Sequence, residues 1–240
     1  LAVLAGIAVG ALLGLLIERV FIRRLRSAGP TAQTVGTVGA LTLAIAVASR
    51  VWGTQAVNQP VILPGGALRV FGGFVGYDLI GIFPIALLAG VALFALFRFT
   101  DVGLAMRGAA ENRRGAALRG VDPDRTAMLV WVLGGALAGL AGILLSASTE
   151  LDPFSISLGV LPAFVAALIG GLDSLPGVCL GAVVVGVVQG MVPAIGAIPH
   201  LGVVVQGQGA PELALSVLAL AAMALRGNRL STGDIRGDTL

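Results

Sequence analysis

The sequence contains no lysine, one cysteine and one histidine, and only 11% of its 240 residues are charged. A soluble domain usually carries about 25% charged residues, because its surface faces water. Hydrophobic residues make up 57% of the chain, and they occur in long runs rather than as one stripe per helix. This composition excludes an ordinary soluble domain and indicates that lipid surrounds most of the chain.

The scarcity of reactive side chains also limits the possible chemistry. The lone Cys179 lies inside an apolar run, so no disulfide framework is expected, and the simplest interpretation is a small buried apolar side chain. The sequence has no P-loop, no HExxH pattern and no Ser-His-Asp constellation. We therefore expect no catalytic residue, no bound metal and no cofactor, and we do not expect an enzyme.

All 15 basic residues are arginine, and the net charge is +3. A basic chain can indicate nucleic-acid binding, but these arginines lie in short segments between apolar runs. That pattern is typical of the cytoplasmic loops of membrane proteins. We therefore expect the lipid bilayer, and not nucleic acid, as a partner of the chain.

Seven apolar runs predict an all-α fold, a polytopic transmembrane bundle of about seven membrane segments. The runs cover approximately residues 1–17, 34–49, 79–97, 127–145, 159–172, 177–192 and 211–225. The fifth is short for a bilayer span and contains Pro162, so either an ordinary short helix or a re-entrant or broken helix is expected. We expect one membrane domain over 1–225 and a cytoplasmic tail over 226–240.

The arginines sort the connecting segments onto two sides of the membrane. If the runs alternate, thirteen arginines fall on one side, in residues 18–30, 98–125 and the tail. Only Arg50 and Arg69 fall on the other side. The positive-inside rule makes the thirteen-arginine side cytoplasmic.

The opposite loop, residues 51–78, is long and only weakly apolar. Its turn signal Pro64-Gly65-Gly66 lies between Val61–Leu63 and Leu68–Val70. This arrangement predicts a small hairpin or an extended loop outside the membrane.

Helix boundaries are signalled at two further places. Ser174 is expected to cap the sixth helix, with Pro176 in its first turn. Gly120, followed shortly by Pro123, is expected to end a helix.

Small residues four positions apart predict faces where helices pack closely. The spacing does not distinguish a partner helix within this chain from one in another subunit. The pairs are Gly135 with Gly139, Gly177 with Gly181, and Gly186 with Gly190.

The segment 98–125 is the most informative connection. Leu104–Arg119 is rich in good helix formers, so one short helix is expected there. The spacing of Arg107 and Arg114 from Glu111 allows ion pairs on one face of that helix. Two interpretations stay open: a solvated helix that only joins two spans, or a coupling helix that docks in a groove of a cytoplasmic motor protein.

Several stretches of the chain resemble the branched-chain amino-acid ABC importer permeases, most of all their H-type membrane subunit. These stretches are Gly103–Arg107, Ala110–Asn112, Ala116–Val121, Gly134–Gly142, Ala163–Ser174 with Gly177, and the Pro-Gly-Gly loop near residue 64. Asp173 departs from the family, where glycine is common at that place. Because the family normally begins with a further helical region, the resemblance implies an N-terminally truncated chain.

The resemblance implies a permease domain that carries branched-chain or other hydrophobic amino acids, driven by ATP that it does not itself hydrolyse. The implied partners are a second permease subunit in a homodimer or heterodimer, two cytoplasmic ATP-binding subunits and an extracytoplasmic solute-binding protein that docks on loop 51–78. The implied location is the bacterial cytoplasmic (inner) membrane, with several passes. A secondary transporter or channel for a small polar solute, such as urea or an amide, is the alternative.

By position, the same resemblance assigns contacts with the ATP-binding subunit to one group of residues in segment 98–125. Arg107 is expected to orient the helix or to meet lipid headgroups. The coupling helix is assigned Arg107 together with the expected contact residues Ala109, Ala110, Glu111, Asn112, Ala116 and Gly120. No substrate-binding residue is assigned.

Overall fold

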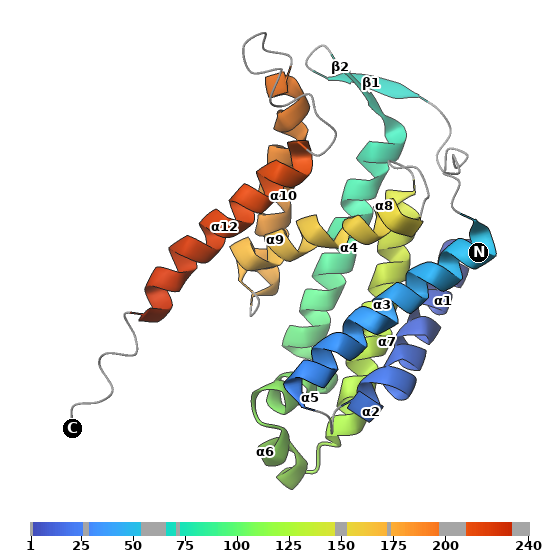
Figure 1. The fold of residues 1–240 in the computed structure, drawn as a ribbon, viewed down its shortest axis with the longest axis vertical. Helices are drawn as coiled ribbons and strands as arrows, with labels where there is room; N and C mark the ends of the chain where they lie inside the picture. The colour runs from blue at the N-terminus through green and yellow to red at the C-terminus, as the bar shows by residue number, and fades with distance from the viewer. Residues whose placement is uncertain are drawn as a thin grey trace. The chain divides into compact units, whose positions relative to one another are not determined.

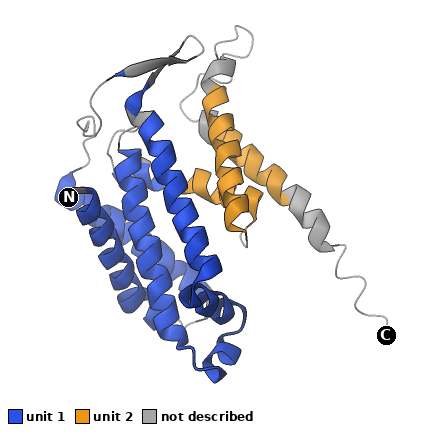
Figure 2. Ribbon diagram, turned by 180° about the vertical axis from the view of Figure 1, so that it is seen from behind, with its two compact units in different colours: residues 1–157 blue, residues 158–240 orange. Residues whose placement is uncertain are grey.

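The computed structural model describes residues 2–25, 29–53, 66–70, 73–146, 153–171, 174–196 and 210–231. The chain divides into two compact units, Leu1–Ser157 and Leu158–Leu240 (Figure 2). Each unit is built from helices, which confirms the predicted all-α class, and unit 1 adds one short hairpin (Figure 1).

The first helices of unit 1 follow the pattern of apolar runs and breakers. Helix α1 (Ala2–Ile17) continues through a π-helical turn, η1 (Glu18–Ile22), into α2 (Arg23–Leu25). Helix α3 (Pro30–Trp52) begins with proline in its first turn, where the missing N–H is not needed. It ends at Gly53, whose φ of 85° suits glycine.

The segment 51–78 contains a hairpin, one of the two forms expected for it, and its strands lie within residues 67–76. Strand β1 (Ala67–Val70) pairs antiparallel with β2 (Gly73–Gly76), from Ala67↔Gly76 to Val70↔Gly73. Residues 61–63, on the other side of the Pro64-Gly65-Gly66 signal, lie outside the described part, so their pairing with residues 68–70 stays a prediction. Residues 54–65 lie outside the described part.

Two long helices flank the segment 98–125 in unit 1. Helix α4 (Tyr77–Phe99) enters it and α7 (Pro123–Leu145) leaves it, and a short helix α8 (Pro153–Leu158) follows. Helices α1 and α7 pack side by side (Figure 1). This is the most extensive helix contact in unit 1.

Unit 2 contains α9 (Val160–Gly170), α10 (Leu175–Gly196) and α12 (Ala210–Ser231). Its core consists of Val165, Ala166, Val185 and Leu215. Helix α12 runs past residue 225 into the predicted tail, and residues 232–240 lie outside the described part.

Within the fifth apolar run the structure has one uninterrupted short helix, α9, with Pro162 in its first turn, so the ordinary short helix is the form observed. Helix α8 ends at Leu158, and α9 begins at Val160 after a turn at Gly159. The capping prediction for the sixth run is confirmed, because the Ser174 Oγ accepts the N–H of Gly177 at 3.2 Å. Pro176 lies in the first turn of α10 as expected.

Among the described residues, five helices are long and apolar enough to cross a membrane, and two shorter apolar helices complete the seven runs. The long ones cover Val3–Leu25, Thr31–Trp52, Ile80–Phe99, Pro123–Leu145 and Leu175–Val192, and the shorter ones cover Ile156–Gly170 and Leu213–Met223. Large apolar side chains such as Leu88, Val35 and Leu180 are exposed along these helices. So extensive an apolar surface suits lipid rather than water.

Candidate functional site

Segment 98–125 forms two helices instead of the one expected. Helix α5 (Asp101–Glu111) begins earlier than the sequence predicts, because Thr100 caps it. The Thr100 Oγ1 accepts the N–H of Gly103 at 3.1 Å and donates to the carbonyl of Leu96 at 2.6 Å. The cap turns the chain directly from α4 into α5.

Asn112 divides the segment. It adopts an extended backbone (φ −147°, ψ 98°), and its Oδ1 accepts the N–H of Gly115 at 2.8 Å. Helix α6 (Arg113–Leu118) therefore starts anew with Asn112 as its N-cap. The helix-forming residues on both sides favoured a continuous helix, but an asparagine side chain offers the backbone a local alternative.

The end of α6 is where the sequence placed it. Gly120 has a φ of 85°, a conformation that is cheap for glycine alone. Its N–H donates to the carbonyl of Ala117 at 3.0 Å, and the N–H of Val121 donates to that of Ala116 at 3.1 Å. These two bonds form a Schellman motif, which confirms Gly120 as the stop signal.

One face of the two helices is buried within unit 1. Met106 of α5 is 4% exposed and Ala116 of α6 is 7% exposed, and both helices contact α7. Gly103 lies so close to the backbone of α4 that a Cβ there would clash with Phe97. Small or flexible residues therefore allow the segment to pack against the rest of unit 1.

The residues that the family resemblance assigns to the coupling helix and its contact with the ATP-binding subunit fall into two groups. Ala116 is inside, so its methyl group is not available to a partner, and Ala109 is half-buried. The others are exposed: Arg107, Ala110, Glu111, Asn112 and Gly120.

Sequence reasoning missed Leu118, whose side chain is 90% exposed at the end of α6. Its signal was an isolated large apolar residue in a segment of small and charged ones. An apolar side chain this exposed in a polar connection is a natural contact for a partner.

The expected ion pairs of Glu111 with Arg107 and Arg114 are not formed among the described residues. The break at Asn112 changes the helical spacing between Glu111 and Arg114, and Arg107 and Glu111 are both exposed. Solvent competes with such a pair.

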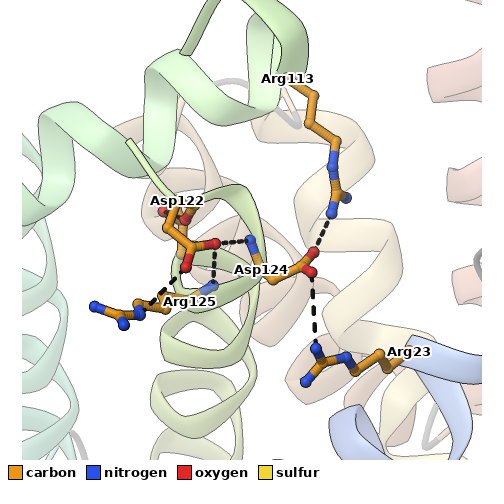
Figure 3. A network of polar contacts seen from close by, with 6 residues as sticks. Arg23, Arg113, Asp122, Asp124 and Arg125 are labelled. Atoms are coloured by element: carbon orange, nitrogen blue, oxygen red, sulfur yellow. Dashed lines mark hydrogen bonds and ion pairs between the residues drawn. The ribbon is translucent and has the colours of Figure 1, made fainter. Parts of the chain in front are cut away.

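The charged groups instead meet at the N-terminus of α7 (Figure 3). The Asp124 carboxylate accepts from Arg113 of α6, and its Oδ2 lies 3.9 Å from the Nη2 of Arg23 in α2. We call Arg23, Arg113 and Asp124 the ion-pair cluster. It brings the two arginine-rich segments, 18–30 and 98–125, to one end of unit 1.

Asp122 caps α7 beside this cluster. Its Oδ1 accepts the backbone N–H groups of Asp124 at 2.9 Å and Arg125 at 3.3 Å. These hydrogen bonds, first that of Arg125 and then that of Asp124, hold the pKa of the Asp122 carboxyl below its ordinary value. The cap therefore stays ionised at neutral pH and favours the helix N-terminus.

Glycine contacts join α1 to α7. A Cβ on Gly135 would lie less than 3.0 Å from the carbonyl oxygen of Gly10, and one on Gly139 would lie 2.6 Å from that of Gly6. The structure therefore places Gly135 and Gly139 against a partner helix of the same chain. The stripe of Gly6, Gly10 and Gly14 on α1 was not identified from the sequence.

The other glycine pairs lie in unit 2. A Cβ on Gly177 would clash with the backbone of Gly170, and one on Gly181 would clash with that of Ala166, so α10 packs closely on α9. A Cβ on Gly186 or Gly190 would meet nothing within 4 Å. Cys179 of α10 is exposed, so its expected burial is wrong. The packing face of α10 lies on the side of Gly177 and Gly181.

Glu18 is a further residue whose burial differs from what the sequence predicted. The first apolar run was predicted over residues 1–17, which leaves Glu18 just outside it. The helix instead continues through η1, and Glu18 lies within the candidate span Val3–Leu25 at 2% exposure. Glu18 follows Gly14 by four residues, so it extends the glycine stripe that packs on α7. That spacing was the signal available in the sequence.

Comparison with known proteins adds the family. The family model described as "Branched-chain amino acid transport system / permease component" matches residues 1–224. The chain belongs to this family. No solved structure gives a significant match.

Among the described residues, no group of three or more histidine, cysteine, aspartate or glutamate side chains is arranged to hold a metal ion.

The curated relatives are permeases by name. The high-affinity branched-chain amino acid transport system permease protein LivH of Salmonella typhimurium is 28% identical over 193 residues, which is 78% of this chain and 63% of LivH. The corresponding protein BraD of Pseudomonas aeruginosa is 30% identical over 77% of this chain and 62% of BraD. The probable LivH of Methanocaldococcus jannaschii is 33% identical over 50% of this chain.

This chain spans 38% of the length of the Methanocaldococcus jannaschii relative and 63% of the Salmonella typhimurium relative. Family membership and a multi-pass membrane architecture therefore stand, because the family match covers nearly the whole chain.

Proposed function

We propose that this chain is the membrane-spanning permease subunit of an ATP-driven importer for branched-chain or other hydrophobic amino acids. The observation that carries the proposal is the family match over residues 1–224. The amino-acid assignment follows the relatives that match most of the chain. Relatives named as xylose and fructose permeases match only 43% and 45% of it. Membership of a permease family also favours this function over a secondary transporter or channel.

The proposed contact for a cytoplasmic ATP-binding subunit consists of exposed residues of α5, α6 and the positions that flank α6, together with the half-buried Ala109. We call this group the coupling surface: Arg107, Ala109, Ala110, Glu111, Asn112, Leu118 and Gly120. It combines small residues that allow close approach, one large apolar side chain and charges of both signs. A groove on the partner lined by apolar and charged groups would accept such a surface.

The further parts of the assembly follow from the same proposal. Two such permease subunits, in a homodimer or heterodimer, enclose a pathway across the bacterial cytoplasmic membrane. Each contacts one ATP-binding subunit, and a solute-binding protein docks at loop 51–78 on the other side. ATP binding and hydrolysis in the partners move the coupling surfaces and so switch the pathway between outward-facing and inward-facing states.

The Glu111→Arg variant tests this function. Glu111 is exposed on α5, so the change leaves the packing of unit 1 intact while it reverses a charge in the middle of the coupling surface. We expect ATP-driven uptake into vesicles to fall at least tenfold and the ATP-binding subunit to be lost on affinity purification, while membrane insertion is normal. Like-charge contacts at an interface cost enough to produce such a loss.

Asp101→Arg is the matched control, because it makes the same charge reversal at the opposite end of α5 and outside the coupling surface. It should retain the partner and most of the uptake. Normal uptake by Glu111→Arg would refute the assignment of the surface. An unmodified permease that purifies without any ATP-binding subunit, and whose uptake is indifferent to ATP, would refute the importer itself.

A further inference from the structure

Asp124 links three separate segments of unit 1. It lies in the first turn of α7, and its carboxylate contacts Arg113 at the start of α6 and Arg23 in α2 (Figure 3). Arg23 and Arg113 are far apart in the sequence, and each is about half exposed. A shared carboxylate therefore joins the end of the first membrane helix to the helix that carries Leu118.

Helix α6 has few other means of holding its orientation. It is six residues long, which is too short for a helix to be stable by itself. The break at Asn112 interrupts the backbone hydrogen bonds that would otherwise make it a rigid extension of α5. Its residues are exposed apart from Ala116, which is buried, and Gly115, which is half-buried.

The other two members of the ion-pair cluster, Arg23 and Asp124, belong to helices that are closely packed. Helix α2 continues from α1 through η1 without a break, and α1 packs on α7 through glycines whose backbones nearly touch. Asp124 itself belongs to α7, and its N–H is fixed by the Asp122 cap. The cluster thus ties a short, weakly held helix to a closely packed helix pair.

We propose that Asp124 is a positioning residue, which holds α6 in place through Arg113 and Arg23 and passes movement of the coupling surface to the α1–α7 pair. The first half of this inference concerns the chain alone. The second half rests on the proposed function. Because exposed ion pairs add little to global stability, loss of Asp124 changes the local mobility of α6 rather than unfolding the protein.

Spin-label spectroscopy of the full-length permease in lipid vesicles tests the first half. A nitroxide is attached at Leu118→Cys in a Cys179→Ser background, where the 90% exposed position leaves the packing undisturbed. We expect Asp124→Asn to raise the mobility of the label and Asp124→Glu to keep it low. Asp101→Asn is the matched control, because it removes a carboxylate from the first turn of α5, outside the cluster, and should leave the spectrum unchanged.

A double-mutant cycle makes this test specific for the ion pair. Arg113→Gln should raise the mobility as Asp124→Asn does, and the double variant should show no further increase, because both changes remove the same contact. An unchanged spectrum in Asp124→Asn overturns the inference. Additive effects of the two substitutions overturn the pairing.

Transport by the reconstituted complex with its ATP-binding subunits tests the second half. We expect Asp124→Asn to lower the uptake per ATP hydrolysed several-fold while the complex still assembles, and Asp101→Asn to leave this ratio unchanged. An unchanged ratio in Asp124→Asn overturns the transmission of movement. Failure of the unmodified permease to bind any ATP-binding subunit overturns the proposed function instead, and the spectroscopic result still decides the first half.

Discussion

Gly134 and Gly135 are adjacent in α7, yet their surroundings differ completely. A side chain on Gly135 would meet the backbone of Gly10, which cannot move aside without separating α1 from α7. A side chain on Gly134 would meet nothing within 4 Å. In lipid, where apolar burial drives helices together only weakly, such close backbone contact is a main source of association.

We therefore expect Gly135→Ala to destabilise the protein by about 1–3 kcal/mol, the usual cost of overpacking. Thermal unfolding of the detergent-solubilised chain, followed by circular dichroism, measures the effect. Gly134→Ala is the matched control, and alanine's better helix propensity should leave stability equal or slightly higher. Equal melting temperatures for the two variants would mean that α1 and α7 do not touch at Gly135.

At the scale of elements, the decisive feature is the division of segment 98–125. Thr100, Asn112 and Asp122 each cap a helix, so α5, α6 and α7 all begin with a side chain that accepts backbone N–H groups. The caps allow three changes of direction within a short stretch. They place the buried Met106 and Ala116 against unit 1 and the coupling surface outside.

Replacing Asn112 by alanine should loosen α6. Loss of an N-cap costs about 1 kcal/mol, so amide hydrogens in residues 113–118 should exchange about five times faster. Hydrogen–deuterium exchange with mass spectrometry measures this rate. Asn112→Asp, which retains a capping oxygen, should exchange as the unmodified chain does. Slower exchange in Asn112→Ala would contradict the prediction and show that α5 and α6 fuse into one helix.

At the scale of the whole molecule, the described helices account for the seven apolar runs, and charge is concentrated at one end of unit 1. Helix α4 has 23 residues, enough to cross a bilayer about 30 Å thick. It separates the hairpin at its start from α5 at its end. The ion-pair cluster joins segments 18–30 and 98–125, which is compatible with their predicted position on one side of the membrane.

Accessibility to a membrane-impermeant maleimide checks this sidedness. In a Cys179→Ser background, Leu118→Cys should be labelled in inverted membrane vesicles and protected in intact cells. Gly76→Cys is the reciprocal position, since a Cβ there meets nothing within 4 Å, and it should be labelled in intact cells. Labelling of both positions from the same side would contradict the seven-segment topology.

The sequence alone was sufficient for the class of protein, the positions of the helices and several of their ends. Long apolar runs, the arginine distribution, the cap at Ser174 and the stop at Gly120 are properties of single residues or short windows. Their physical causes, transfer into lipid and local backbone geometry, act within those windows. The family resemblance in segment 98–125 was likewise readable because its motif is continuous.

The tertiary structure decided the features that depend on distant residues. The division of segment 98–125 at Asn112 is not of this kind, because its cap reaches only to Gly115; there the helix formers on both sides misled the prediction. Burial of Glu18 and the pairing of Arg113 with Asp124 depend on which helices become neighbours. No local window contains that information, because glycine contacts and shared carboxylates gain their energy only after α1, α6 and α7 have come together.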